Sequence, residues 1–267
     1  MSTARHSVWG VSSLMLGVMV LSGCATQQAT TPAQPAVAVG DPVQVYAAGS
    51  LRDALTEIAR DHEARTGQKV VLTFAASGLL RERIEQGAPA QVFASADTKH
   101  PQRLANQGQW QAPVVFTRNT LCALAQGAVA VTSDTLLSTM LQPQVRLGIS
   151  TPKADPAGDY AWALFQKADA LQAGATARLE TKALQLTGGA QSAQAPAGRN
   201  TYAWVMEQNR ADVFLTYCTN AVAARAEVPS LQVVAVPEAL QVGAAYGLTV
   251  RAGAPAQAQA FAQAVLQ

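Results

Sequence analysis

Two serines stand at points where an apolar strand turns directly into a helix. Ser50 follows the strand in Val43–Glu57, which reads VQVYAAGSLRDALTE, and Ser77 holds the same place in KVVLTFAASGLLRERI, residues 69–84. A strand that enters a helix through small residues leaves backbone N–H groups and a short hydroxyl at the positive end of the helix dipole. Two such turns close together in the sequence predict one anion held between two helix N-termini.

Serine at the start of a helix also has a simpler role, because it commonly caps the first N–H groups of its own helix. A catalytic role is disfavoured for Ser50, since AAGSL differs from the G-x-S-x-G turn of serine hydrolases. His62 lies about three turns along the following helix, too far from Ser50 to act as its base. The sequence also lacks paired carboxylates and H-x-x-x-H ligand spacing. We therefore expect a binding protein without catalytic residues, cofactor or metal site.

The composition is that of a globular α/β protein and gives no sign of a nucleic-acid partner. Apolar residues make up 49% of the 267 residues and charged residues 13%, the latter well below the ~25% of an ordinary domain. The formal net charge is only +2. So small a value implies neither a nucleic acid nor an acidic surface as the partner.

Residues 1–24 have the pattern of a bacterial export signal. An apolar run, Val8–Leu21, follows a short basic start and is too short for a comfortable membrane span of ~20 residues. The segment ends in LSGC, which resembles the lipobox whose cysteine, here Cys24, is lipidated and becomes the new N-terminus. The alternative is an ordinary signal peptide that is cut near Ala25. Residues 25–40 are polar and Pro-rich, and we expect a flexible linker there.

Two further cysteines, Cys122 and Cys218, lie in segments that we expect to be strands, LCALA and VFLTYC. After export both would lie in an oxidising compartment, where a cysteine pair favours a disulfide over a metal site or a catalytic thiol. Two buried free thiols, too far apart to form a bond, are the alternative.

Strands and helices alternate along the chain, which predicts an α/β fold with parallel strands and right-handed crossovers. The alternation restarts near residue 119, so we expect two lobes, one formed by 41–118 together with 232–267 and the other by 119–231. A ligand would then lie in the cleft between the lobes, at the C-terminal ends of the strands. Residues 184–198, rich in Gly, Ala and Gln, are expected to form a loop.

The two serine turns belong to a longer pattern that resembles a known family. VYAAGSLRDALTEIA followed by FAASGLLRERIEQGAPAQVFASAD is similar to the first lobe of periplasmic molybdate-binding proteins, the capture component of molybdate ABC importers. The turn Pro156–Gly158 and the segment Asp212–Tyr217 resemble the second lobe, so the match runs in order through residues 43–267. The resemblance implies a periplasmic-binding-protein-like type II fold, whose two lobes close over the oxyanion.

The resemblance also implies a ligand, partners and a location. The ligand would be molybdate or tungstate, and the partner would be a membrane ABC permease. The protein would act as a monomer, in the periplasm or on the cell surface, held to the membrane through lipidated Cys24. The alternatives are another small anion, such as a sulfate-like oxyanion or an organic acid, and a lipoprotein used for sensing or adhesion.

Five residues match positions that contact the oxyanion in that family. Ser50 and Ser77 match two serines that donate through the hydroxyl and the backbone N–H. Ala157 matches a backbone N–H donor at a helix start, and Tyr217 matches a tyrosine whose hydroxyl reaches the ligand. Arg199 matches a helix-opening position that contributes an N–H, although the family usually has an apolar residue there.

An arginine in the cleft would make the binding of the anion charge-assisted. Each assignment has an alternative from ordinary folding. The serines would then cap helices, Arg199 would lie exposed beside a loop, and Tyr217 would be a core aromatic residue.

Overall fold

The strand β1 (Val43–Ala48) is the centre of the first lobe in the computed structural model, which describes residues 40–267. The expected export signal, and all but the last residue of the expected linker, lie outside the described residues. β2 (Val70–Ala75) and β3 (Val92–Ser95) pair with β1 on its two sides, both parallel to it. The helical segments that follow these strands are η1 (Gly49–Leu51, a 3-10 turn), α1 (Arg52–Thr66), α2 (Ser77–Glu85) and α3 (Lys99–Asn106).

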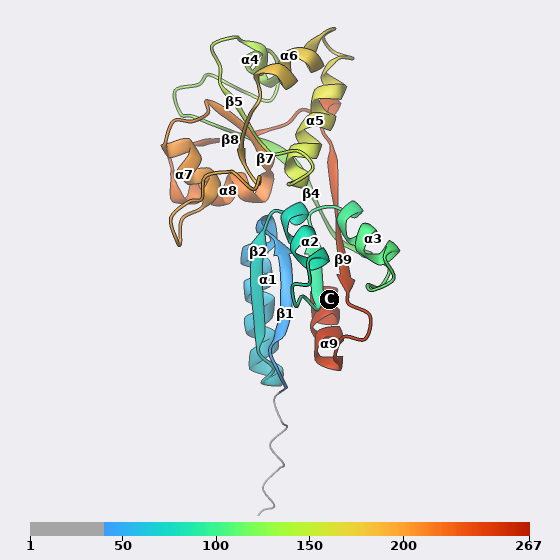
Figure 1. Ribbon diagram of the computed structural model, residues 1–267. Helices are drawn as coiled ribbons and strands as arrows, with labels where there is room; N and C mark the ends of the chain where they lie inside the picture. The colour runs from blue at the N-terminus through green and yellow to red at the C-terminus, as the bar shows by residue number, and fades with distance from the viewer. Residues whose placement is uncertain (1–39) are drawn as a thin grey trace, which may run out of the picture. The chain divides into compact units, whose positions relative to one another are not determined.

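The long strand β4 (Val114–Ala125) takes part in both lobes. Its first half pairs antiparallel with β9 (Gly243–Val250), and its second half pairs antiparallel with β7 (Val213–Tyr217) and β8 (Gln232–Ala235). The strands therefore follow one continuous path, β2-β1-β3-β9-β4-β7-β5-β6, with β8 beside β4. Figure 1 shows β4 and β9 running between the helices α1–α3 and the helices α4–α8.

The second lobe contains a strand that we expected to be a loop. β5 (Leu147–Ser150) pairs in parallel with β7 and with β6 (Leu184–Thr187), which falls within the expected loop at 184–198. β6 is an edge strand of only four residues, so its hydrophobic alternation is too short to stand out from the sequence. Cys218 begins a helix rather than ending a strand. The helices of this lobe are α4 (Leu136–Leu141), α5 (Pro156–Ala168), α6 (Ala175–Lys182), α7 (Thr201–Glu207) and α8 (Cys218–Glu227).

The chain returns to the first lobe after β8. The expected boundary at residue 232 places β8 in the first lobe, but β8 pairs with the second half of β4. The return therefore lies between Ala235 and the start of β9, and includes the 3-10 turn η2 (Glu238–Leu240). The last helix, α9 (Ala256–Val265), contacts α1, β1 and β9.

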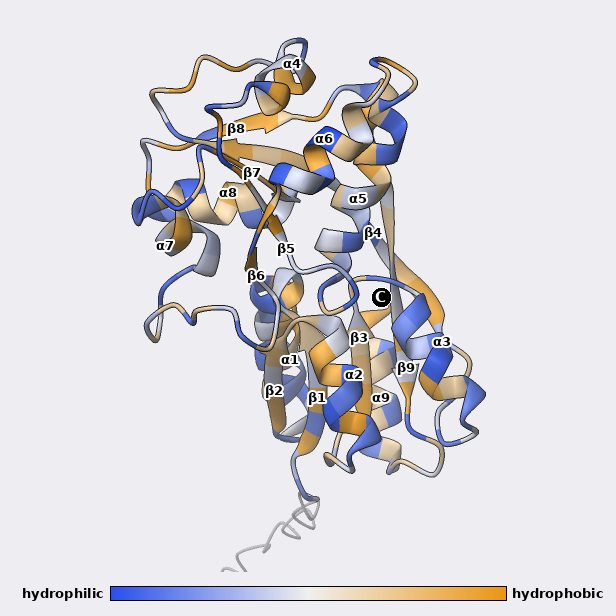
Figure 2. Ribbon diagram, turned by 45° about the horizontal axis from the view of Figure 1, so that its top comes forward, coloured by the Kyte–Doolittle hydropathy of each residue, from blue (hydrophilic) through white to orange (hydrophobic). Residues whose placement is uncertain are grey.

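Apolar side chains line the strands of both lobes. Val45 and Val92 in the first lobe, and Leu121 and Leu215 in the second, are almost completely buried. Figure 2 shows the strands largely in the hydrophobic colour, with hydrophilic patches on the outer turns of α2 and α3. Within residues 40–267, no helix is both long and apolar enough to cross a membrane.

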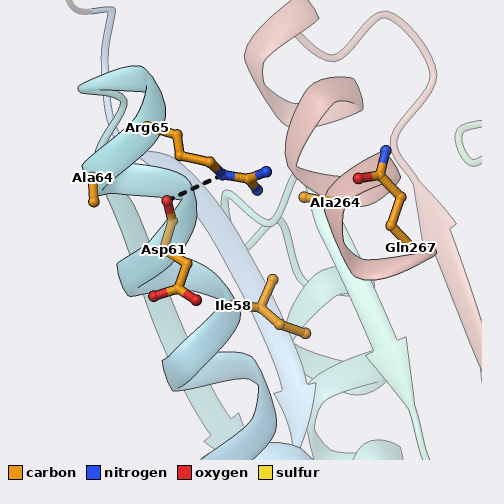
Figure 3. Close-up of a pocket in the computed structure, with 6 residues that line it drawn as sticks. All are labelled: Ile58, Asp61, Ala64, Arg65, Ala264 and Gln267. Atoms are coloured by element: carbon orange, nitrogen blue, oxygen red, sulfur yellow. Dashed lines mark hydrogen bonds between the residues drawn. The ribbon is translucent and has the colours of Figure 1, made fainter.

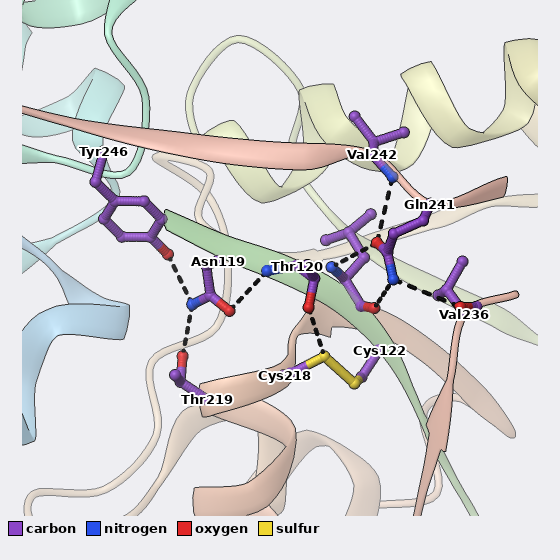
Figure 4. The surroundings of a disulfide bond; sticks show 10 residues. Asn119, Thr120, Cys122, Cys218, Thr219, Val236, Gln241, Val242 and Tyr246 are labelled. Carbon is purple, nitrogen blue, oxygen red and sulfur yellow. Dashed lines mark hydrogen bonds between the residues drawn. A yellow bond between two sulfur atoms is a disulfide. The ribbon is translucent and has the colours of Figure 1, made fainter. Parts of the chain in front are cut away.

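The expected disulfide is confirmed. Cys122 of β4 is bonded to Cys218, the first residue of α8, across a sequence separation of 96 residues. Figure 4 shows the bond beside Thr120, whose hydroxyl lies 3.3 Å from Cys218 Sγ. Tyr217, which immediately precedes Cys218, pairs with Leu121 of β4. The disulfide therefore fixes the end of β7 to the strand shared by the two lobes.

Replacing both cysteines by serine is expected to lower the free energy of unfolding by about 4 kcal/mol, because a cross-link over so long a loop restricts the unfolded chain. Urea denaturation of the two proteins measures the loss. Reductant should destabilise the wild type by a similar amount and leave the double variant unchanged. Equal stability of the oxidised wild type and the double variant would contradict this role.

Candidate functional site

Three of the five predicted site residues lie where strands of the two lobes end. Ser50 follows β1, Ser77 follows β2, and Tyr217 is the last residue of β7. The link between the lobes is Ala96, just after β3. Its N–H donates to Ser77 Oγ at 3.0 Å, and its carbonyl accepts from the Tyr217 hydroxyl at 3.2 Å. Ser77 and Tyr217, from different lobes, are thus held by the two polar groups of one residue.

Ser77 is 1% exposed and begins α2. Its backbone N–H is one of the first four of the helix, which have no partner within the helix itself. Its hydroxyl oxygen already accepts a hydrogen bond from Ala96, so the hydroxyl proton is the part that stays available for a ligand. The local fold therefore prepares Ser77 as a donor.

A chain of hydrogen bonds orients Ser50 in the same way. The Asn119 side-chain amide donates to the Tyr246 oxygen at 3.2 Å and to Thr219 Oγ1 at 3.0 Å (Figure 4). An amide nitrogen can only donate, so the proton of Tyr246 is free to point at Ser50 Oγ, 2.9 Å away. Ser50 then keeps its own proton for an acceptor in the cleft.

The tyrosines of the site are held as neutral donors. Burial raises the pKa of Tyr217 well above its usual value, and burial also raises the pKa of Tyr246, against the opposing effect of its hydrogen bonds with Ser50 and Asn119. The two rings lie 5.5 Å apart between centroids, and the Tyr160 ring lies 6.2 Å from that of Tyr217. A neutral phenol can donate one hydrogen bond to an anion without repelling it.

Ala157 occupies the first turn of α5, and its N–H already has a partner. Asp155 is the N-cap residue of α5, and its Oδ1 accepts from the Ala157 N–H at 3.0 Å. Pro156 between them suits a helix start because its missing N–H would have no partner there. Burial raises the pKa of Asp155 to about 6, helped by the charges of Asp159 and Asp97 and opposed by hydrogen bonds from Ala157 and Ser150.

The two lobes also touch directly through their backbones. The Gly78 N–H, in the first turn of α2, donates to the Ala154 carbonyl of the second lobe at 2.9 Å. A Cβ at residue 78 would lie 2.6 Å from that carbonyl oxygen, so only glycine allows the contact. Ser77, Gly78 and the loop before α5 are therefore packed together in this conformation.

Arg199 is not brought together with the other four residues. Its guanidinium pairs with Glu207 at 2.8 Å and with Glu227, and hydrogen bonds to both carboxylates raise its pKa. Glu227 ends the 10-residue helix α8 that Tyr217 precedes, which at 1.5 Å per residue puts the two ends roughly 15 Å apart. A ligand contact by Arg199 stays a prediction, and in this conformation two carboxylates engage its charge.

Sequence reasoning missed Asn119, Tyr246 and Asp155. Nothing in their local pattern marks Asn119 or Tyr246, because they meet Ser50 only through the long-range pairing of β4 with β9. Asp155 did carry a signal, since an Asp-Pro pair before an apolar helix predicts an N-cap. That signal indicates a helix start and says nothing of a site.

A surface hollow lies elsewhere, between the second half of α1 and the end of α9. Figure 3 shows its lining by Ile58, Asp61, Ala64, Arg65, Ala264 and Gln267. The Arg65 guanidinium there donates to the backbone carbonyl of Asp61 at 3.4 Å. This hollow is at the far end of α1 from Ser50, so it does not join the group of donors described above.

Comparison with known proteins shows the family to which the chain belongs. The family described as bacterial extracellular solute-binding protein matches residues 43–267. A protein of Pasteurella multocida, described as uncharacterized, is 39% identical over 179 residues, which are 67% of this chain and 74% of that protein. The molybdate-binding protein ModA of Escherichia coli is 34% identical over 135 residues, 47% of this chain and 51% of that protein. This chain thus matches only about half the length of that relative.

Among solved structures, the sulfate-binding protein SubI from Mycobacterium tuberculosis has a TM-score of 0.66 at 16% identity, covering 85% of this chain and 82% of that one. So low an identity shows the fold alone. The chain belongs to the bacterial extracellular solute-binding proteins. The expected two-lobed α/β fold of type II periplasmic binding proteins is confirmed, and the proteins of this family are substrate-binding proteins.

Gly78→Ala is expected to hinder closure of the lobes, because the added methyl group would meet the Ala154 carbonyl oxygen at 2.6 Å. Affinity for the bound solute should fall about tenfold or more, while thermal stability should change little, since alanine favours a helix more than glycine. Small-angle scattering measures the closure of the lobes, calorimetric titration measures the affinity, and a melting curve measures the thermal stability. Gly243→Ala is the control, because nothing lies within 4 Å of its added Cβ. Wild-type affinity in the Gly78 variant would show that the contact between Gly78 and Ala154 is not needed for the lobes to close on the solute.

Tyr246→Phe is expected to weaken solute binding five- to tenfold, about 1 to 1.4 kcal/mol, because Ser50 would lose the donor that frees its proton. Calorimetric titration measures the affinity. Tyr46→Phe, on β1 of the same lobe, is the matched control. A Tyr246 variant that binds as tightly as the control would show that the hydrogen-bond chain does not orient Ser50.

Proposed function

We propose that this protein is the substrate-binding component of an ABC importer that captures molybdate, and also tungstate, between its lobes. The observation that carries the proposal is the orientation of two serine hydroxyls. Ser50 and Ser77 each have a donor directed at their oxygen, from Tyr246 and from Ala96 N–H, so both can present protons to one acceptor. The similarity to the molybdate-binding protein of Escherichia coli supports the choice of ligand.

The chemistry of a tetrahedral oxyanion fits such a set of donors. Each of its four oxygens accepts hydrogen bonds, and neutral donors at helix N-termini can replace its water shell without a counter-charge. Serine suits the position because it is short and leaves its backbone N–H open to the ligand. Discrimination between molybdate and sulfate would then depend on the size of the cage, since the two anions have the same charge and shape.

Tyr217 would couple capture to closure. Its hydroxyl donates to the Ala96 carbonyl of the other lobe at 3.2 Å, and a captured anion would take over that proton. An anion that contacts both lobes binds the closed form better than the open form, and this difference in affinity is all that closure requires. The same anion would thus be enclosed and made ready for a permease.

The proposal includes the expected location and partners. The protein would be exported, anchored through lipidated Cys24 in the periplasm or on the cell surface, and active as a monomer that docks on a membrane permease. Capture of another small anion, such as sulfate or an organic acid, is the competing function. A titration with several oxyanions distinguishes the two functions.

Calorimetric titration of the purified protein with molybdate, tungstate, sulfate and phosphate tests the proposal. Molybdate and tungstate should bind, and Ser50→Ala or Ser77→Ala should weaken binding about 10- to 100-fold, because each removes a hydrogen bond to a charged group. Ser138→Ala, at an exposed serine of α4, is the control. Melting curves establish that the Ser77 variant is folded, since Ala96 N–H loses its acceptor there.

The absence of heat and of thermal shift with molybdate and tungstate would refute the proposed ligand. Binding of sulfate alone would favour the competing function. Serine variants that keep wild-type affinity would place the anion elsewhere.

A further inference from the structure

One carboxylate lies among the donors of the proposed anion site. Asp155 Oδ1 accepts from the N–H of Ala157, the group that the family resemblance assigns to the ligand. Asp155 Oδ2 lies directly over Gly188, where a Cβ would be only 2.4 Å away. The carboxylate is thereby held in one orientation, and the preceding residue, Ala154, is the one that contacts Gly78 of the first lobe.

The surroundings of Asp155 contain other acids and phenols. The charged groups that act on its pKa are two carboxylates, Asp97 of the first lobe and Asp159 of its own helix. Its charge in turn raises the pKa values of Tyr202 on α7, Tyr217 on β7 and Tyr246 on β9.

Asp155 is largely surrounded by protein but is not completely buried. Burial is the largest cause of its raised pKa, but Asp155 as a residue keeps intermediate exposure, while Pro156 and Ala157 after it are buried. Behind the start of α5, the Ser150 hydroxyl lies 2.9 Å from Thr187 Oγ1. Asp155 is thus held by the first turn of α5 and by Gly188, and part of the residue remains accessible to solvent.

A bare dianion in this place would meet an unfavourable neighbour. Two negative charges at short range repel strongly where little water separates them. The repulsion becomes an attraction when one proton lies between them, because the contact is then a charge-assisted O–H···O hydrogen bond.

We propose that Asp155 is a specificity-determining residue that shares a proton with the captured oxyanion, so that the site takes a tetrahedral oxyanion together with one proton. This inference rests on the proposed function and refines its substrate class to singly protonated oxyanions, or dianions that bind with proton uptake. The proton comes from solvent, and no other bond forms or breaks. A pKa of about 6 for Asp155 means that the proton is within reach near neutral pH.

Proton uptake can be measured directly on the wild type. Molybdate is titrated into the protein at pH 6, 7 and 8, at each pH in two buffers with different ionisation enthalpies. We expect the uptake of about one proton at pH 8, and a Kd that rises about tenfold per pH unit above pH 6, because the proton must be bound along with the anion.

Asp155→Asn is the diagnostic variant. The amide oxygen can still accept from Ala157 N–H, so the cap of α5 is kept, while the amide N–H₂ offers a donor to a fully ionised anion. Binding of molybdate should become independent of pH between 6 and 8, and affinity for sulfate relative to phosphate should rise. Asp169→Asn, whose Oδ1 accepts from Thr176 N–H at the other end of α5, is the matched control and should keep the proton uptake.

The outcomes separate this inference from the proposed function. Wild-type binding of an oxyanion without proton uptake, or with the same pH profile in the Asp155 variant, would overturn the inference and leave the proposed function standing. If the wild type binds none of molybdate, tungstate, sulfate and phosphate at any of these pH values, the proposed function and the inference both fail. The experiment with two buffers on the wild type shows whether a proton is taken up with the anion, even if the Asp155 variant does not fold.

Discussion

The antiparallel pairing of β4 with partners from both lobes is the constraint on which the site depends. One half of the strand pairs with β9 and the other with β7 and β8, so the two lobes cannot be positioned independently. Asn119 lies near the change of partner and reaches Tyr246 on one side and Thr219 on the other. The geometry of the donors at Ser50 is thus a direct consequence of how one strand is shared.

The site itself is made by directing hydrogen bonds rather than by placing charge. Ala96 and Tyr246 contact the oxygens of Ser77 and Ser50, which leaves the hydroxyl protons of both serines pointing elsewhere. The formal net charge of +2 for the whole chain and the engagement of Arg199 by two carboxylates fit this principle. Asp155 is the exception, and burial raises the pKa of its carboxyl group to about 6, helped by the charges of Asp159 and Asp97.

The sequence predicts the features that depend on local order. The serine turns, the α/β alternation and the cysteine pair all follow from short patterns. The edge strand β6 was missed because four residues carry too little periodicity. The pairing of β8 with β4 is likewise invisible in a local pattern, because it joins residues more than one hundred positions apart. Tyr246 and Asn119 could not be found for the same reason. Their role exists only once β9 lies beside β4.

The disulfide has a mechanical consequence for release. Cys218, the residue after Tyr217, is bonded to Cys122 of β4, so the backbone at the end of β7 is tied to the strand that both lobes share. Opening by rotation of a whole lobe about the shared strands would carry Tyr217 and this joint together. The lifetime of the closed state is therefore a property of the hinge. A permease that collects the solute would then have to bind both lobes and move them apart, rather than displace a single loop.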